Sequence, residues 1–304
     1  MPSPAPLSDA QREAAIPAGI ACIMAGIFFL TLSDSLAKWL GQFYAPIQLL
    51  FMRGALALPV VTVLVLAWGG RRALRTRYLG THLLRGAVNV ASASCFYLGL
   101  TMLPLAETTA IAFAAPLCVT ALSVIAFGER VDARAWAAVL IGFVGVLIVV
   151  RPGMAGFQPA ALLPLATAVG YAVMMVSARR IGPEEGMLTT MFYIALGQVL
   201  VSAAAQPWFW QPVQSQHALG IAGIALFSTL GLGLITQGFR IAPASVVAPF
   251  DYTGLIWAAL IGWLFWDEVP DAWAYTGAAL IVGSGLYIAM RQGLKRRGAS
   301  RRRG

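Results

Sequence analysis

Four polar side chains lie at helical spacing within an otherwise apolar stretch near the N-terminus. They are Thr31, Asp34, Ser35 and Lys38, spaced i, i+3, i+4 and i+7, so they share one face of an α-helix. Such a stripe offers an anion to an ammonium group and a cation to a carboxylate, as a site for a small zwitterion would. In the alternative interpretation, Asp34 and Lys38 form a structural ion pair, and the Lys38 ammonium extends to the end of the apolar stretch.

A further charge lies inside the next apolar stretch, where Arg53 has no acid in its own predicted helix. A guanidinium in apolar surroundings needs a partner, and Asp34 or the carbonyl groups at a helix end can provide one. Arg53 therefore either binds the carboxylate of a solute or clamps two helices together.

Asp251 stands near the start of a later apolar stretch, beside Tyr252 and two residues after Pro249. Proline removes a backbone donor and kinks a helix, which exposes a carbonyl group to a solute. We therefore count Asp251 and Tyr252 among the candidate binding residues, and Asp34 and Asp251 as candidate proton carriers. The alternative is that Asp251 is an acid at the end of the apolar stretch, paired with Arg240.

The uncharged candidates are Asn89, Tyr97, Tyr171 and Gln237. A few polar groups among apolar and aromatic walls are what a small-molecule site needs. Each residue also has a structural interpretation, since Asn and Gln tie membrane helices together and Tyr gathers in interfacial belts.

The composition shows what surrounds these residues. Of 304 residues, 59% are hydrophobic and 11% are charged, whereas a soluble domain carries about 25% charged residues. The chain therefore lies largely in lipid. Its net charge of +9 comes from short basic clusters between apolar runs, which is typical of membrane topology and excludes a nucleic-acid face. The three cysteines lie inside apolar runs without metal-ligand spacing, and we expect no cofactor or metal.

About 20 apolar residues span a bilayer as a helix, and the sequence contains ten candidate runs. They lie near residues 17–39, 46–68, 81–102, 107–127, 135–150, 160–178, 187–205, 218–239, 245–266 and 272–290. With ten spans, most Lys and Arg residues fall on the same side as both termini. The excess of basic residues predicts an N-terminal segment 1–16 and a basic tail 291–304 that are both cytoplasmic, in a multi-pass inner (plasma) membrane protein.

The chain also contains a long internal repeat. Pro104 and Glu129 match Pro243 and Glu268 at the same offset, and a Gly-rich apolar run follows each copy. The halves are residues 17–152 and 158–290, with five predicted spans each, so the second half enters the membrane inverted. Inverted repeats are a transporter architecture, with the binding site between the halves.

Small residues occur at matched places in the fifth and tenth spans, as Ala138-xxx-Gly142 and Ala279-xxx-Gly283. This spacing lets helix backbones approach closely. We expect these two spans to pack on each other or to form a dimer contact.

These features resemble the drug/metabolite transporter superfamily, and in particular its EamA-like branch of ten spans in two inverted repeats. The resemblance covers nearly the whole chain and includes Asp34–Leu40, Pro46–Gln48 and Phe51–Arg53. It implies a secondary transporter that moves a small metabolite by alternating access. The substrate it suggests is a neutral or aromatic amino acid for export, with uptake of an S-adenosylmethionine- or riboflavin-like solute as the alternative. The partners expected are this solute and membrane lipid, with no nucleic acid, for a monomer or weak homodimer.

Two other classes of protein fit the sequence poorly. An intramembrane enzyme would need a catalytic motif, and the chain has no HExxH, GxSxG or phosphate-binding loop. A channel would need a ring of like charges or a carbonyl filter, whereas this chain has scattered single charges. We therefore expect a transporter and no enzyme activity.

Overall fold

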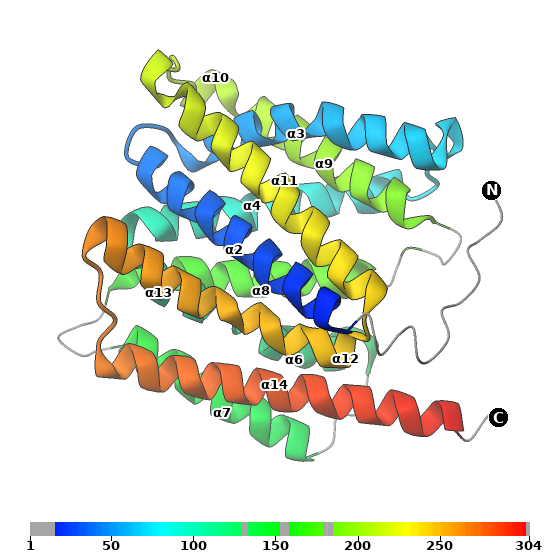
Figure 1. Cartoon of the computed structure of the whole chain (residues 1–304), viewed down its shortest axis with the longest axis vertical. Helices are drawn as coiled ribbons and strands as arrows, with labels where there is room; N and C mark the ends of the chain where they lie inside the picture. Colours follow the sequence, from blue (N-terminus) through cyan, green and yellow to red (C-terminus); the bar gives the residue numbers. More distant parts are fainter. Residues whose placement is uncertain (1–15, 129–132, 153–157, 179–180, 182–184, 302–304) are drawn as a thin grey trace.

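The computed structural model describes residues 16–128, 133–152, 158–178, 181 and 185–301. Within these ranges every regular element is a helix (Figure 1). The first half holds α2 (Ile16–Leu40), α3 (Pro46–Gly69), α4 (Leu79–Met102), α5 (Leu105–Ala112), α6 (Ala115–Phe127) and α7 (Ala133–Val150). The second half holds α8 (Leu162–Ser177), α9 (Met187–Ala204), α10 (Gln206–Phe209), α11 (Ala218–Ile241), α12 (Ala244–Val247), α13 (Thr253–Trp266) and α14 (Ala272–Arg301). The predicted N-terminal segment up to residue 15, and Glu129, lie outside the described residues.

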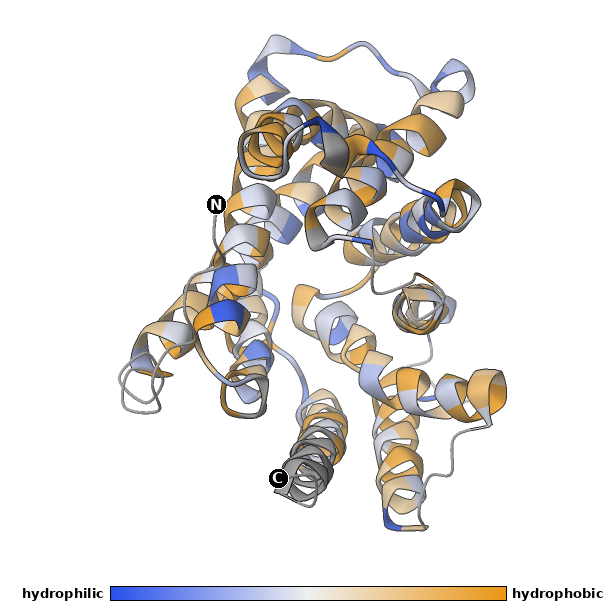
Figure 2. Cartoon of the chain, turned by 90° about the vertical axis from the view of Figure 1, so that its right-hand side faces the viewer, coloured by the Kyte–Doolittle hydropathy of each residue, from blue (hydrophilic) through white to orange (hydrophobic). Residues whose placement is uncertain are grey.

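The helices confirm the predicted all-α membrane fold. Eight helical stretches in the described ranges are long and apolar enough to cross a membrane, and two shorter apolar helices occupy the positions of the seventh and tenth predicted spans. Large hydrophobic side chains such as Val63, Leu140 and Leu264 are exposed on the outer surface, and hydrophobic residues cover most turns of the helices (Figure 2). In lipid this exposure carries no penalty. The last helix continues from the tenth predicted span through most of the predicted basic tail, as far as Arg301.

Two of the predicted spans are broken within the membrane region. The fourth is divided between α5 and α6 at Phe113 and Ala114, and Pro116 lies in the first turn of α6. The ninth opens with the 3₁₀ helix η5 (Ala248–Tyr252), which has Pro249 in its first turn and leads into α13. Proline donates no backbone hydrogen bond, which makes it compatible with such a break. The rings of Phe113 and Tyr252 lie 5.1 Å apart, so the two breaks meet inside the protein.

The helices pack in pairs that join the two halves of the chain. In these pairs α2 packs on α11, α4 on α8, α3 on α9, α5 on α13 and α7 on α14. In Figure 1, α2 and α11 run across the middle of the molecule, and α7 and α14 lie together along one side. The core therefore forms between the halves, and neither half encloses a separate core.

Small residues allow the close approach of α7 and α14. A Cβ atom at Gly277 would lie 2.6 Å from the carbonyl oxygen of Gly145, so neither backbone could keep its place if a side chain were added. The expected packing of these two helices is therefore confirmed. The Ala279-xxx-Gly283 motif is not the contact, however: Ala279 is exposed and a Cβ at Gly283 would meet nothing within 4 Å. The motif predicts the right helix but the wrong face.

This packing predicts opposite effects for two glycine substitutions in the same helix. Gly277→Ala introduces overlap with α7 and should lower the free energy of unfolding by about 1–3 kcal/mol, as overpacking does. Gly283→Ala points into open space and should be neutral or slightly stabilising, because alanine favours helix by roughly 0.5–1 kcal/mol. Thermal unfolding of the purified variants in detergent measures both. Equal melting temperatures for the two variants would contradict the assigned contact.

Candidate functional site

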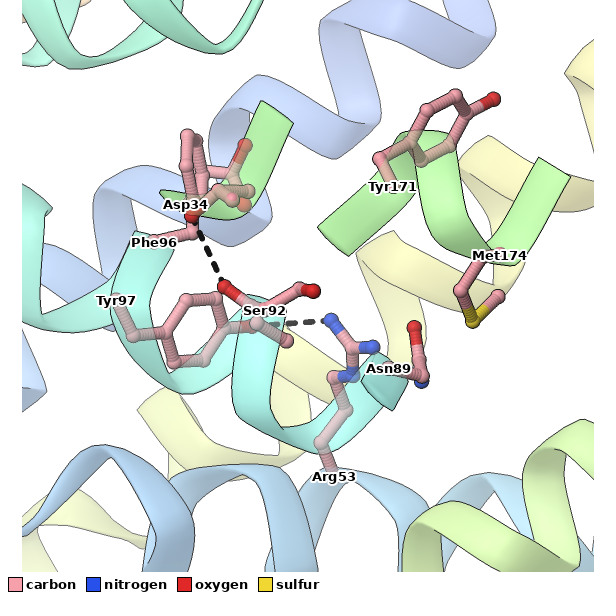
Figure 3. A pocket seen from close by; sticks show the side chains of 10 residues that line it. Asp34, Arg53, Asn89, Ser92, Phe96, Tyr97, Tyr171 and Met174 are labelled. Atoms are coloured by element: carbon pink, nitrogen blue, oxygen red, sulfur yellow. Dashed lines mark hydrogen bonds between the residues drawn. The ribbon is translucent and has the colours of Figure 1, made fainter. Parts of the chain in front are cut away.

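A cavity of about 180 Å³, with polar groups among largely apolar walls, lies between α2, α3, α4 and α8 (Figure 3). The residues that line it are Asp34, Arg53, Asn89, Ser92, Ala93, Phe96, Tyr97, Thr167, Tyr171 and Met174. Five of the nine predicted binding residues are among them, contributed by four different helices: Asp34, Arg53, Asn89, Tyr97 and Tyr171. The sequence selected these residues as polar groups within apolar runs, and the fold brings them together around one space.

Arg53 is the central cation of the cavity. Its guanidinium donates hydrogen bonds to the hydroxyl of Tyr97 at 3.1 Å and to the amide oxygen of Gln198 at 3.3 Å. Both acceptors are neutral, so the positive charge is oriented but not neutralised by a carboxylate within 4 Å in the described part of the chain. Figure 3 shows the guanidinium between Tyr97 and Asn89, with Tyr171 and Met174 of α8 on the far side of the space. A side chain held in this way is arranged to receive an anionic group.

Asp34 provides the anion of the same cavity. Its carboxylate interacts electrostatically with Arg53, yet no hydrogen bond or ion pair joins it to another described residue. The alternative interpretation, in which Asp34 forms an ion pair with Lys38, is therefore wrong. An anion and a cation that face one cavity without pairing are complementary to a solute that carries both charges.

Gln198 of α9 holds this arrangement together and was not predicted. Its amide nitrogen donates to the carbonyl oxygen of Leu50 at 3.0 Å, and its amide oxygen accepts from Arg53 and, at 3.4 Å, from Asn89. The side chain is buried, and it joins α9 to α3 and α4. The sequence signal was a lone amide in an apolar span, the same signal by which Gln237 was selected.

Lys38 lies outside the cavity and is fully used within the protein. Its ammonium group pairs with Glu268 at 2.7 Å and donates to the carbonyl oxygens of Leu100 at 2.9 Å and Leu103 at 2.6 Å. The second carboxylate oxygen of Glu268 accepts from the backbone N–H of Leu105 at 2.8 Å. These contacts tie α2 and the α4–α5 junction to the end of α13. Glu268 thus has a structural role.

The other predicted residues also lie apart from the cavity. Gln237 is exposed on α11. Tyr252 packs on Phe113 at the meeting point of the two helix breaks. Asp251 lies next to it in η5, where its Oδ1 is buried without a hydrogen-bond partner in the described structure. Asp251 interacts electrostatically with Tyr171, which connects this second position to the wall of the cavity.

Comparison with known proteins supports one class of function. The model of the EamA-like transporter family matches the chain twice, over residues 17–151 and 158–290. A relative from Rickettsia prowazekii, named S-adenosylmethionine uptake transporter, is 25% identical over 89% of this chain and 92% of its own. The pseudopaline exporter of Pseudomonas aeruginosa is 26% identical over 88% and 94%, and the riboflavin transporter of Vibrio cholerae is 29% identical over 77% and 79%.

A solved crystal structure has the same fold. Its chain is 21% identical, with a TM-score of 0.57, and the match covers 91% of this chain and 98% of that one. At this identity the likeness supports the fold alone.

The Lys38–Glu268 pair predicts a large stability effect. Lys38→Met leaves the Glu268 carboxylate, which is partly buried, without its charge partner, and breaking a buried pair in this way costs up to about 3–5 kcal/mol. We expect a clearly lower melting temperature in detergent, and less than additive losses when Lys38→Met and Glu268→Gln are combined.

The exposed pair of Arg151 and Asp271 is the matched control. Arg151 hydrogen-bonds Asp271 and lowers the pKa of that carboxyl group below its usual value. The two side chains are 20% and 46% exposed, so Asp271→Asn should cost no more than about 1 kcal/mol. Equal losses for Lys38→Met and Asp271→Asn would contradict the structural role of Lys38.

Proposed function

Because this chain belongs to the EamA-like transporter family, we propose that it is a secondary transporter for a small zwitterionic solute. The observation that carries the proposal is the unpaired Asp34 and Arg53 in one cavity. The carboxylate of Asp34 suits an ammonium group, and the guanidinium of Arg53 suits a carboxylate, with Asn89 beside it as a further hydrogen-bond partner. An α-amino acid carries both charged groups on one carbon atom.

The dimensions of the site favour an amino acid over a larger solute. The cavity of about 180 Å³ is smaller than the roughly 300–1,000 Å³ of pockets that hold drug-sized ligands. Phe96 and Met174 supply apolar walls for a side chain. We therefore place export of neutral or aromatic amino acids first.

Uptake of S-adenosylmethionine is the second candidate. Several similar proteins are named S-adenosylmethionine uptake transporters, and this solute also carries an α-amino acid group that Asp34 and Arg53 could bind. The adenosine part requires a wider cavity than the one in this conformation. A riboflavin-like solute has neither the ammonium nor the carboxylate, so the charges of the site favour it less.

The helix pairs support transport by two inverted halves. Exchanging the halves turns the pair α2–α11 into α8–α4, and the pairs α3–α9 and α7–α14 into themselves. The two broken spans also correspond, and broken helices at matching places in two repeats are typical of a transporter's central region. We infer ten spans in two inverted repeats, with both termini on the cytoplasmic side because the basic clusters lie there.

A flux experiment tests the proposal. Purified full-length protein in liposomes preloaded with labelled leucine, phenylalanine and methionine should release them saturably. Asp34→Asn and Arg53→Gln should each reduce the rate about tenfold or more, since each removes a charge-assisted hydrogen bond worth roughly 1.5–3 kcal/mol. The matched controls are Asp271→Asn and Arg71→Gln, which make the same changes at exposed positions and should transport normally.

The same liposomes separate the alternatives. Uptake of labelled S-adenosylmethionine without release of amino acids would favour the second candidate. A pH gradient that accelerates release in the wild type would support proton coupling through Asp34 or Asp251, and release that ignores the gradient would exclude it. Transport that survives Asp34→Asn and Arg53→Gln unchanged would refute the assigned site.

A further inference from the structure

The third span contains a second guanidinium that the cavity does not use. Arg85 of α4 is 3% exposed, and its Nε and Nη1 atoms are buried without any hydrogen-bond partner in the described structure. No ion pair reaches it within 4 Å there. Burying an arginine in this way is costly unless an anion joins it.

Neighbouring residues leave the Arg85 charge uncompensated. One turn earlier in α4, His82 bonds the carboxylate of Glu185 at 3.0 Å and stacks on Tyr193. Among the residues that the structure describes here, the acid of this cluster is Glu185, and its carboxylate is engaged by His82. Close packing of Gly86 on Gly197 fixes the α4 backbone beside this cluster.

The position of Arg85 continues the polar face of the cavity. Residues 85, 89, 92 and 96 are spaced i, i+4, i+7 and i+11, so they share one side of α4. Asn89, Ser92 and Phe96 line the cavity, whereas Arg85 lies one turn beyond its end.

Packing against α8 identifies what lies across from Arg85. A Cβ atom added at Gly99 of α4 would contact Pro164 of α8, and one added at Gly170 of α8 would contact Ser92 of α4. Residue numbers thus rise along α8 as they fall along α4, so the two helices are antiparallel. The same register places Arg85 opposite Ser177, the last residue of α8, just past Met174. Asn89 and Met174 line the cavity, and Arg85 and Ser177 follow them about one turn further along the two helices.

We propose that Arg85 is a second anion-binding site on the solute passage, which takes the carboxylate after Arg53 when the passage opens beyond Asn89 and Met174. As a part of a transport path, this site rests on the proposed function. Arg53 and Arg85 then form two successive positions for one negative group at different depths of the membrane. The uncompensated guanidinium favours the conformation in which a carboxylate can reach it, because only that conformation satisfies its donors.

The test measures anion binding separately from transport. The melting temperature of purified full-length protein is followed as sodium acetate replaces sodium chloride at constant ionic strength. In the background Arg53→Met, acetate should still raise the melting temperature, and the additional change Arg85→Met should abolish that rise. The control Arg71→Met, at an exposed arginine, should leave it intact. An acetate effect that is the same with and without Arg85 would overturn the proposal.

Stability distinguishes a binding role from a structural one. Arg85→Met removes an unpaired buried charge, so in chloride its melting temperature should equal or exceed that of the wild type. A markedly lower melting temperature in a variant that still folds would show that the guanidinium supports the fold and would overturn the proposal. If Arg85→Met does not fold, Arg85→Lys is used in its place. Lysine keeps the positive charge but loses the bidentate hydrogen bonding of the guanidinium, and an undiminished acetate effect in this variant would contradict the site.

Flux through liposomes completes the test. Arg85→Met should slow phenylalanine release about tenfold or more and reduce the preference for phenylalanine over phenylalaninamide, which lacks the carboxylate. Wild-type protein that releases no amino acid would refute the proposed function, while the acetate titration would still decide whether Arg85 binds anions. Normal release by Arg85→Met would overturn the site alone.

Discussion

The Lys38 ammonium satisfies its three N–H groups with a carboxylate and two backbone carbonyl oxygens, and much of the structure depends on this. A cation inside an apolar helix bundle is tolerated only when its donors are satisfied. Lys38 achieves this by joining α2, the junction of α4 with α5, and the end of α13. Glu268, in turn, satisfies the first free N–H of α5. One ion pair thus fixes the ends of helices from both halves.

The same physical requirement separates structural charges from functional ones. Lys38 is balanced by Glu268 and fully bonded, so nothing remains for a solute. Asp34 and Arg53 lie at the wall of a cavity, and neither has an opposite charge in contact with it. A solute can therefore supply the opposite charge to each side chain. The first arrangement is balanced within the protein, and the second leaves both groups at the wall of the cavity.

Helix positions were predictable from sequence because they depend on local composition. Apolar run length located eight helices long and apolar enough to cross a membrane, and two shorter ones, in the described ranges, and the predicted polar stripe of α2 supplies one cavity residue, Asp34. The choice of partner was not local. Asp34 and Lys38 sit one turn apart, yet Lys38 pairs with a residue 230 positions away. The same applies to Gln198, whose importance comes from meeting Arg53 and Leu50 of another helix. Close contact of α7 with α14 was expected, but its exact face depends on which glycine meets a backbone.

The distribution of unpaired charge also constrains how the protein can work. A passive bundle would gain stability by replacing Arg53 with an apolar residue or by giving it a carboxylate within 4 Å. Asp34 is close enough to interact electrostatically with Arg53, yet the two side chains form no ion pair. Instead, Tyr97 and Gln198 hold the guanidinium by neutral hydrogen bonds, which fix its direction and leave its charge available. Neutral acceptors on α4 and α9 thus position the cation of α3 without neutralising it. A cation positioned in this way is open to an anionic group in the cavity, which a permanent ion pair would prevent.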